Sequence, residues 1–210
     1  MIVSQHANVV VVPVSLRMDV FQQYWLIKNN IVKEDASGFF TPVAVQCTDD
    51  DFEILILQDR IQVVSKCGDL AEGLGLASRK MIDLLSAAGS AALPISGGGL
   101  NALIALSGGN AKPELIRAEF LNSELIDKEA EVASIGLNFA QKLGFGLVTT
   151  KLSFGVHAVT SEEAIIMDFN CHRELASLEE LKILFADTGP FVQYCLGRVD
   201  LVNSRIAGEE

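Results

Sequence analysis

Residues 42–65 hold the most regular pattern in the chain, and this pattern limits the class of fold. The segment contains three stretches rich in apolar and β-branched residues, separated by the acidic run 49–51 and by the dipeptide Gln58-Asp59. Apolar residues that alternate with a period of two, between short polar turns, are typical of antiparallel strands. We therefore expect a three-stranded meander.

A two-residue turn at Gln58-Asp59 determines which residues of the last two strands lie opposite each other. It places Leu57 opposite Arg60 and Ile54 opposite Val63. Side chains alternate between the two faces of a strand, so one face is continuously apolar. The other face mixes polar and apolar side chains, and we expect it to be partly covered. The apolar face carries Phe52, Ile54, Ile56, Ile61 and Val63.

The rest of the chain combines strand and helix patterns. Asn8–Leu16 is β-branched, which favours a strand, and Pro13 would place it at a sheet edge or a bulge. Asp19 can cap a helix over 20–30. Residues 100–106 fit either a strand or a short buried helix. Further helices are expected at 69–86, at 114–143 up to Gly144 with a break near 122–127, at 178–186 after the capping box Ser177-Leu-Glu-Glu180, and from Pro190 onward. A second hairpin is expected at 145–157 and 163–172.

The order of these elements indicates the fold class. Strands in antiparallel runs, rather than in strict alternation with helices, predict an α+β fold of antiparallel meanders and hairpins packed with helices. Residues 1–210 then form a single domain. A meander followed by a helix in the first half resembles a hairpin followed by a helix in the second, so two similar halves, about 1–90 and 91–210, remain an alternative.

Composition excludes several classes of partner. The net charge is −11, from 16 basic and 27 acidic residues, which argues against direct binding to nucleic acid. No apolar run approaches the roughly 18 residues that span a bilayer, so no membrane partner is expected. Hydrophobic residues make up 50% of the chain and charged residues only 20%, below the usual value of about 25%. With this much apolar material and so little charge, either both faces of the sheet are covered or part of the surface is buried against another chain.

The cysteines and the start of the chain point to a reducing compartment. The four cysteines form no C-x-x-C pair, and the chain does not open on a secretory signal pattern. We expect free thiols and a cytoplasmic protein. The four are Cys47, Cys67, Cys171 and Cys195.

Ser96-Gly97-Gly98-Gly99 is the most conspicuous local motif. Glycines at a helix N-terminus could offer backbone N–H groups to a phosphate. However, the P-loop and dinucleotide-binding patterns are both absent, and Ser96 does not lie in a G-x-S-x-G elbow. The simpler interpretation is a pair of flexible turns flanking a strand.

The second hairpin places Asp168, Asn170, His172 and His157 on one polar face. A turn centred near Ser161-Glu162 puts His172 opposite Lys151, several residue pairs away from His157. The two histidines therefore cannot bind one metal ion, and we expect neither a metal nor a cofactor. A solvated sheet face is the simpler interpretation, and a ligand or partner site is the alternative.

Two classes of function fit these observations. The first is a non-enzymatic interaction or assembly protein, which contacts a protein partner or forms a homo-oligomer through a strand edge or an aromatic helix face bearing Tyr24 and Trp25. The alternative is a small-ligand-binding or hydrolytic protein that uses the glycine segment 96–99 or the polar face of the 146–172 hairpin. A cavity lined by either feature would favour the alternative, and a broad exposed apolar patch would favour the first.

Overall fold

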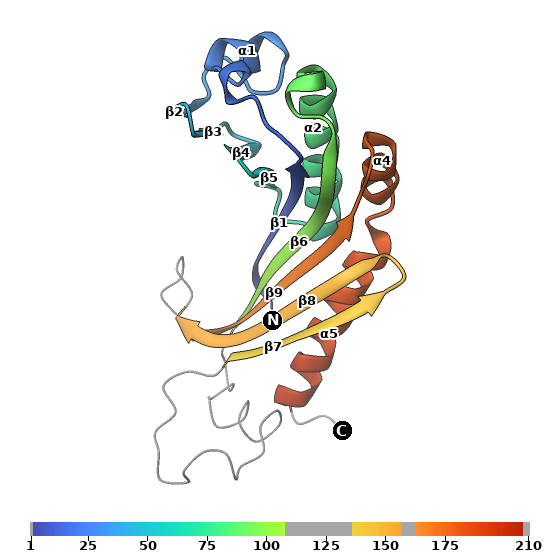
Figure 1. Ribbon diagram of the computed structural model, residues 1–210. Helices are drawn as coiled ribbons and strands as arrows, with labels where there is room; N and C mark the ends of the chain where they lie inside the picture. Colours follow the sequence, from blue (N-terminus) through green and yellow to red (C-terminus); the bar gives the residue numbers. More distant parts are fainter. Residues whose placement is uncertain (1, 108–135, 157–162, 208–210) are drawn as a thin grey trace.

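The protein has an α+β fold built on one nine-stranded antiparallel sheet. The structure, a computed structural model, describes residues 2–107, 136–156 and 163–207 (Figure 1). The described helical segments are η1 (Met18–Val20), α1 (Gln23–Lys28), α2 (Leu70–Ala88), η2 (Gly89–Ala91), α4 (Leu178–Ala186) and α5 (Gly189–Ala207).

The strand order has the same pattern on both sides of its centre. The sheet runs β2-β3-β4-β5-β1-β6-β9-β8-β7, so β1 and β6 pair in the middle. Next to them lie β5 and β9, and each of these is followed along the chain by a long helical segment. The strands are β1 (Ile2–Pro13), β2 (Ser37–Phe40), β3 (Ala44–Thr48), β4 (Phe52–Leu57), β5 (Arg60–Ser65), β6 (Ile95–Ser107), β7 (Gly136–Leu143), β8 (Gly146–Val156) and β9 (Glu163–Glu174).

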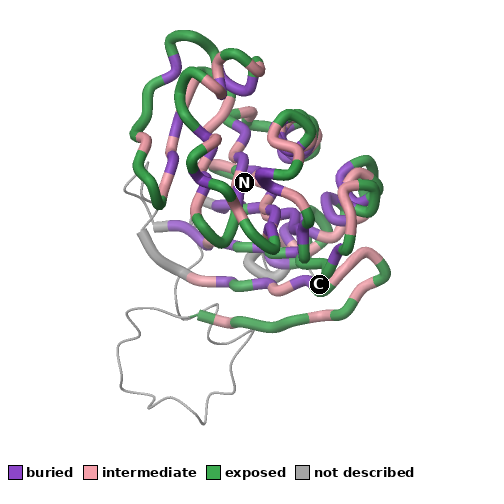
Figure 2. Tube along the Cα trace, turned by 45° about the horizontal axis from the view of Figure 1, so that its top comes forward, coloured by how far each residue is buried: buried purple, intermediate pink, exposed green. Residues whose placement is uncertain are grey.

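Helices cover one face of this sheet. In β1, Ala7, Val9 and Val11 are fully buried on the side that contacts α2, whereas Asn8 and Val10 between them are only half-buried. The helix α5 lies behind β7 and β8 (Figure 1). Along the central strands buried and more exposed residues alternate, while the outermost strand β7 is mostly exposed (Figure 2). We call the side of the sheet that carries Asn8 and Val10 the open face.

The meander expected from residues 42–65 is confirmed in detail. Leu57 pairs with Arg60 and Ile54 pairs with Val63 across β4 and β5. Burial of the apolar face is nearly complete, and β2 adds a fourth strand beyond β3. The turn chemistry and the alternation of side chains were together sufficient to define this register.

Three of the expected helices, α2, α4 and α5, are also confirmed, and the starts of the first two follow from local hydrogen bonds. The Asp69 carboxylate accepts a hydrogen bond from the Glu72 backbone N–H at 2.8 Å and begins α2. The Ser177 hydroxyl accepts one from the Glu180 N–H at 3.2 Å, and the Glu180 carboxylate accepts one from the Ala176 N–H at 2.8 Å. This reciprocal arrangement is a capping box, which begins α4.

Pro13 does not place β1 at an edge, because β1 pairs with both β5 and β6 in the middle of the sheet. Pro13 is instead the last residue of the strand, where the register shifts, so its missing N–H removes nothing from the central ladder.

The prediction that Asp19 caps the next helix is also wrong. The Asp19 carboxylate pairs with Arg17 at 3.0 Å, and α1 begins after Gln22 without a side-chain cap.

The helix expected over 114–143 is wrong in its last part. Residues 136–143 form β7, paired with β8, and Gly144 lies in the turn between these strands rather than at a helix end. A short segment with apolar residues at mixed spacing fits both patterns, and pairing with a neighbouring strand decides between them. Residues 114–135 of this expected helix lie outside the described residues.

Candidate functional site

The three glycines lie inside the central strand β6, so the expectation of flexible turns is wrong. A Cβ on Gly98 would lie 2.6 Å from Leu181 Cδ1, which shows that α4 packs directly against this position on the covered face. A Cβ on Gly97 would lie 2.9 Å from His172 Cε1. The imidazole of His172 therefore rests over the glycine backbone on the open face.

The pairing of β6 with β9 brings the glycine segment and the polar face of the hairpin together. Gly99 lies opposite His172, Asn101 opposite Asn170, and Leu103 opposite Asp168. Two features that the sequence offered as separate candidates thus form one surface on the open face.

The register expected within the second hairpin is wrong, although its faces are right. His172 lies opposite Leu147, and Lys151 lies opposite Asp168. The strands pair as far as Val156 and Glu163, so the pairing is centred two residues earlier in the chain than Ser161-Glu162. A shift by an even number of residues changes the partners but leaves each side chain on its face. His157 lies outside the described residues.

Three asparagine side chains connect the central strands across the open face. The Asn101 amide donates to Asn8 Oδ1 at 2.7 Å, and the Asn170 amide donates to Asn101 Oδ1 at 2.5 Å. The hydrogen bonds run from β9 through β6 to β1. They hold the amides of Asn101 and Asn170 in fixed orientations beside the glycine segment.

These residues border a cavity of about 330 Å³, which we call the central hollow. Four strands supply its walls, and Gly98 and Gly99, which carry no side chain, border it with backbone atoms. Arg60 and Gln62 enter from β5. The lining consists of Val10, Val12, Arg60, Gln62, Gly98, Gly99, Asn101, Asn170 and His172.

His172 also borders two neighbouring hollows on the surface. The first has a volume of about 770 Å³ and includes Ser96, Gly97, Glu174 and Glu180 in its walls. The second, of about 520 Å³, includes Lys142 and Arg173. The imidazole thus lies where three depressions meet.

Asp168 and Ser96 lie outside the central hollow. Desolvation raises the pKa of the Asp168 carboxyl, and the positive charge of Lys151 opposes this effect.

The Ser96 hydroxyl donates to the Val12 carbonyl at 3.2 Å. Within the described residues it has no hydrogen bond to His172, so the arrangement lacks the contact between nucleophile and base that hydrolysis by Ser96 would need.

The two aromatic residues expected at an interface differ in their surroundings. Trp25 packs against the core with its ring edge-on to Phe21, at a centroid distance of 5.4 Å. Tyr24 is 73% exposed. Tyr24 is therefore the more accessible of the two for contact with another molecule.

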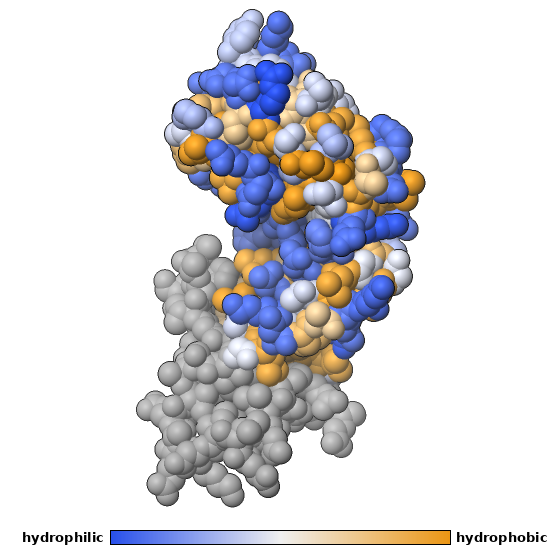
Figure 3. Space-filling model, viewed as in Figure 1, coloured by the Kyte–Doolittle hydropathy of each residue, from blue (hydrophilic) through white to orange (hydrophobic). Residues whose placement is uncertain are grey.

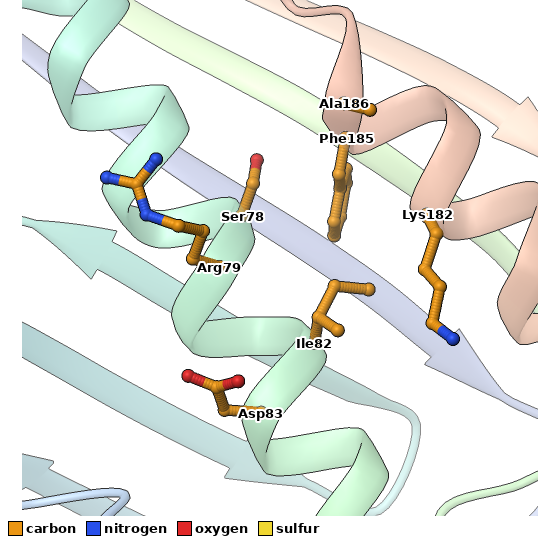
Figure 4. A pocket seen from close by; sticks show the side chains of 7 residues that line it. All are labelled: Ser78, Arg79, Ile82, Asp83, Lys182, Phe185 and Ala186. Carbon is orange, nitrogen blue, oxygen red and sulfur yellow. The ribbon is translucent and has the colours of Figure 1, made fainter.

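A further cavity of about 270 Å³ lies between α2 and α4 (Figure 4). Ile82 and Phe185 form apolar walls, and Lys182 at the border already pairs with Glu179 at 2.6 Å. The Ser78 hydroxyl lies in the gap beside the Phe185 ring and has no hydrogen-bond partner within the described part of the chain. The apolar stripe of α2 is the only signal for this cavity in the sequence.

All four cysteines are free thiols, and three of them are buried. Burial raises the pKa of Cys47 and of Cys171 to about 11.

Over the described ranges, no group of three or more potential metal ligands occurs. No described helix is long and apolar enough to cross a lipid bilayer.

No family model matches the chain, and no curated protein has a significantly similar sequence.

Proposed function

We propose that this protein binds a small polar molecule in the central hollow. The observation that carries the proposal is the convergence of β1, β5, β6 and β9 on one cavity that is lined by the backbone of two glycines and by amides held in place by hydrogen bonds. Binding sites for small molecules are concave, occupy roughly 300–1,000 Å³ and orient a ligand with a few polar groups. The central hollow meets each of these conditions.

The distribution of hydrophobic residues supports this choice over a purely apolar interface. On the face seen in Figure 3, hydrophobic residues form several groups separated by hydrophilic ones, rather than one broad patch. The side chains that line the hollow on the open face include three amides, a guanidinium and an imidazole. Such groups favour hydrogen bonding to a polar ligand.

A bulky substitution tests the proposal. Gln62→Trp places an indole in the hollow from β5, and we expect it to abolish binding of polar fragments. Side-chain amide signals of Asn101 and Asn170 in NMR spectra report occupancy directly. Ala44→Trp is the matched control, because Ala44 lies on the open face in β3 and does not line the hollow.

Fragments that shift the Asn101 and Asn170 signals in the wild type and in Ala44→Trp, but not in Gln62→Trp, would support the proposal. Equal shifts in all three proteins would place binding elsewhere. Thermal melts of each variant verify that the fold is intact.

We propose association with a protein partner or with a second copy as the second candidate function. Tyr24 and several aliphatic side chains are exposed, and β2 and β7 are the outermost strands of the described sheet. Unpaired strand edges and exposed aromatic residues are common at protein contacts. This candidate concerns other parts of the surface and does not exclude the first.

A further inference from the structure

We infer that the ligand of the central hollow is a small anion, whose carboxylate or phosphate oxygens bind at Arg60. The inference rests on the proposed function and specifies the chemistry of the ligand. It follows from the charges, the available donors and the shape of the hollow.

The charge of the hollow differs in sign from that of the chain. The protein has 27 acidic and 16 basic residues. Arg60 and His172 are nevertheless the only titratable side chains among the described residues that line the hollow, and none of these lining residues is Asp or Glu. In a chain this acidic, a cavity without a carboxylate and with a guanidinium favours an anion electrostatically.

The donors of the hollow are available to a ligand. Within the described ranges, Arg60 forms no ion pair, and the side chains of Gln62 and His172 form no hydrogen bond. A guanidinium presents its N–H groups as a planar fork that matches the two oxygens of a carboxylate or phosphate. Gln62 follows Arg60 on the same face of β5 and can donate from its amide.

The other walls limit the rest of the ligand. Val10 and Val12 form an apolar stripe along β1, which suits a short aliphatic body. Past His172, the neighbouring hollow has Glu174 and Glu180 in its walls. These carboxylates disfavour a second anionic group at that end, so a single anionic group beside Arg60 fits best.

NMR titration with three probes tests this inference. Butyrate carries a carboxylate on a short aliphatic body, butyramide is its neutral counterpart, and inorganic phosphate provides the alternative anion. We expect butyrate to bind at least about tenfold more tightly than butyramide, as one charged hydrogen-bonded pair permits. Phosphate should shift the same Asn101 and Asn170 signals if the oxyanion alone is recognised, and its failure to do so would assign the site to carboxylates.

Arg60→Gln should remove the preference for butyrate over butyramide without changing the melting temperature. Arg79→Gln is the control, because it removes the same charge from α2, which packs against the opposite face of the sheet. Equal binding of butyrate and butyramide to the wild type, or an unchanged preference in Arg60→Gln, would overturn the inference that the ligand is an anion bound at Arg60. The hollow would still be a binding site. If no probe shifts the Asn101 and Asn170 signals, both the anion inference and the proposed binding function of the hollow are overturned.

Discussion

At the scale of single residues, Ile54 tests which face of the sheet is buried. It is fully buried in β4, whereas Leu55 beside it is half-buried on the open face. An unpaired buried carboxylate costs several kcal/mol, so Ile54→Asp should severely destabilise the protein. Leu55→Asp should cost much less in the same urea melts. Equal losses would contradict the assigned faces.

Asp168 should make stability depend on pH in a defined direction. Its pKa is raised above the ordinary 3.8, so the folded state holds the proton more tightly than the unfolded state does. The stability that this tighter proton binding contributes is fully present below pH 3.8, and it is lost as the pH rises through the pKa of Asp168 in the folded state. Asp168→Asn should therefore leave the melting temperature equal to or above that of the wild type at neutral pH.

The difference between Asp168→Asn and wild type should shrink as pH falls toward the ordinary pKa, where both side chains are neutral. Melting curves across this range measure it. A variant that is less stable at neutral pH and recovers in acid would show instead that the attraction of Lys151 dominates.

Ser78 combines burial with an unsatisfied hydroxyl. It is 2% exposed, and its oxygen has no partner within the described residues. Burial of an unpaired hydroxyl costs about 1–3 kcal/mol, so Ser78→Ala should increase the free energy of unfolding by about 1 kcal/mol. Ser86→Ala, at an exposed position of α2, is the control and should have little effect. A clear loss of stability in Ser78→Ala would indicate that the hydroxyl is hydrogen-bonded in solution.

At the scale of elements, Gly98 sets the distance between β6 and α4. A Cβ at this position would lie 2.6 Å from Leu181 Cδ1 and 2.9 Å from Leu175 Cδ1, closer than packed atoms approach. Gly98→Ala should destabilise the fold by about 1–3 kcal/mol, because both leucines must move. A Cβ on Gly68 meets no atom within 4 Å, so Gly68→Ala should be nearly neutral in denaturant melts. A neutral Gly98→Ala would mean that α4 adjusts freely.

The same elements show what could be predicted from sequence. Elements defined by local chemistry were predictable: the turn at Gln58-Asp59, the Asp69 cap and the Ser177 capping box. Their signals lie within a few residues of one another. The strand β7 was taken for a helix because its identity depends on pairing with β8.

The candidate site was predictable in part for the same reason. Gly98, Gly99, Asn170 and His172 are candidates from the sequence, but no local pattern places them beside Arg60 and Gln62. That contact depends on β1 lying between β5 and β6. Such an order is set by the packing of the whole sheet.

At the scale of the whole molecule, the exposed apolar residues lead us to predict association. Tyr24 is 73% exposed on α1, and Phe139 is 42% exposed on the outermost strand β7. We expect a homo-oligomer or a complex with a partner protein, detectable by light scattering at micromolar concentration or by affinity capture from the native source. Tyr24→Ser or Phe139→Ser should weaken the contact.

Ile183→Ser is the control for these variants, since Ile183 is equally prominent, at 68% exposed, but lies on α4. A wild-type protein that remains monomeric and captures no partner would rule out association and leave ligand binding as the function to pursue.

The central position of β1 also determines when the sheet can be completed as the chain emerges from the ribosome. The first strand pairs with β5 through contacts such as Ala7 with Ser65, so five strands can assemble early. The other edge of β1 stays unpaired until β6 has been synthesised, because Ile2 in β1 pairs with Leu106 in β6. Long separations of this kind slow folding, and a nascent chain with an unpaired central strand is exposed to wrong partners. Until β6 is synthesised, the assembled strands therefore present the unpaired edge of β1, which favours aggregation.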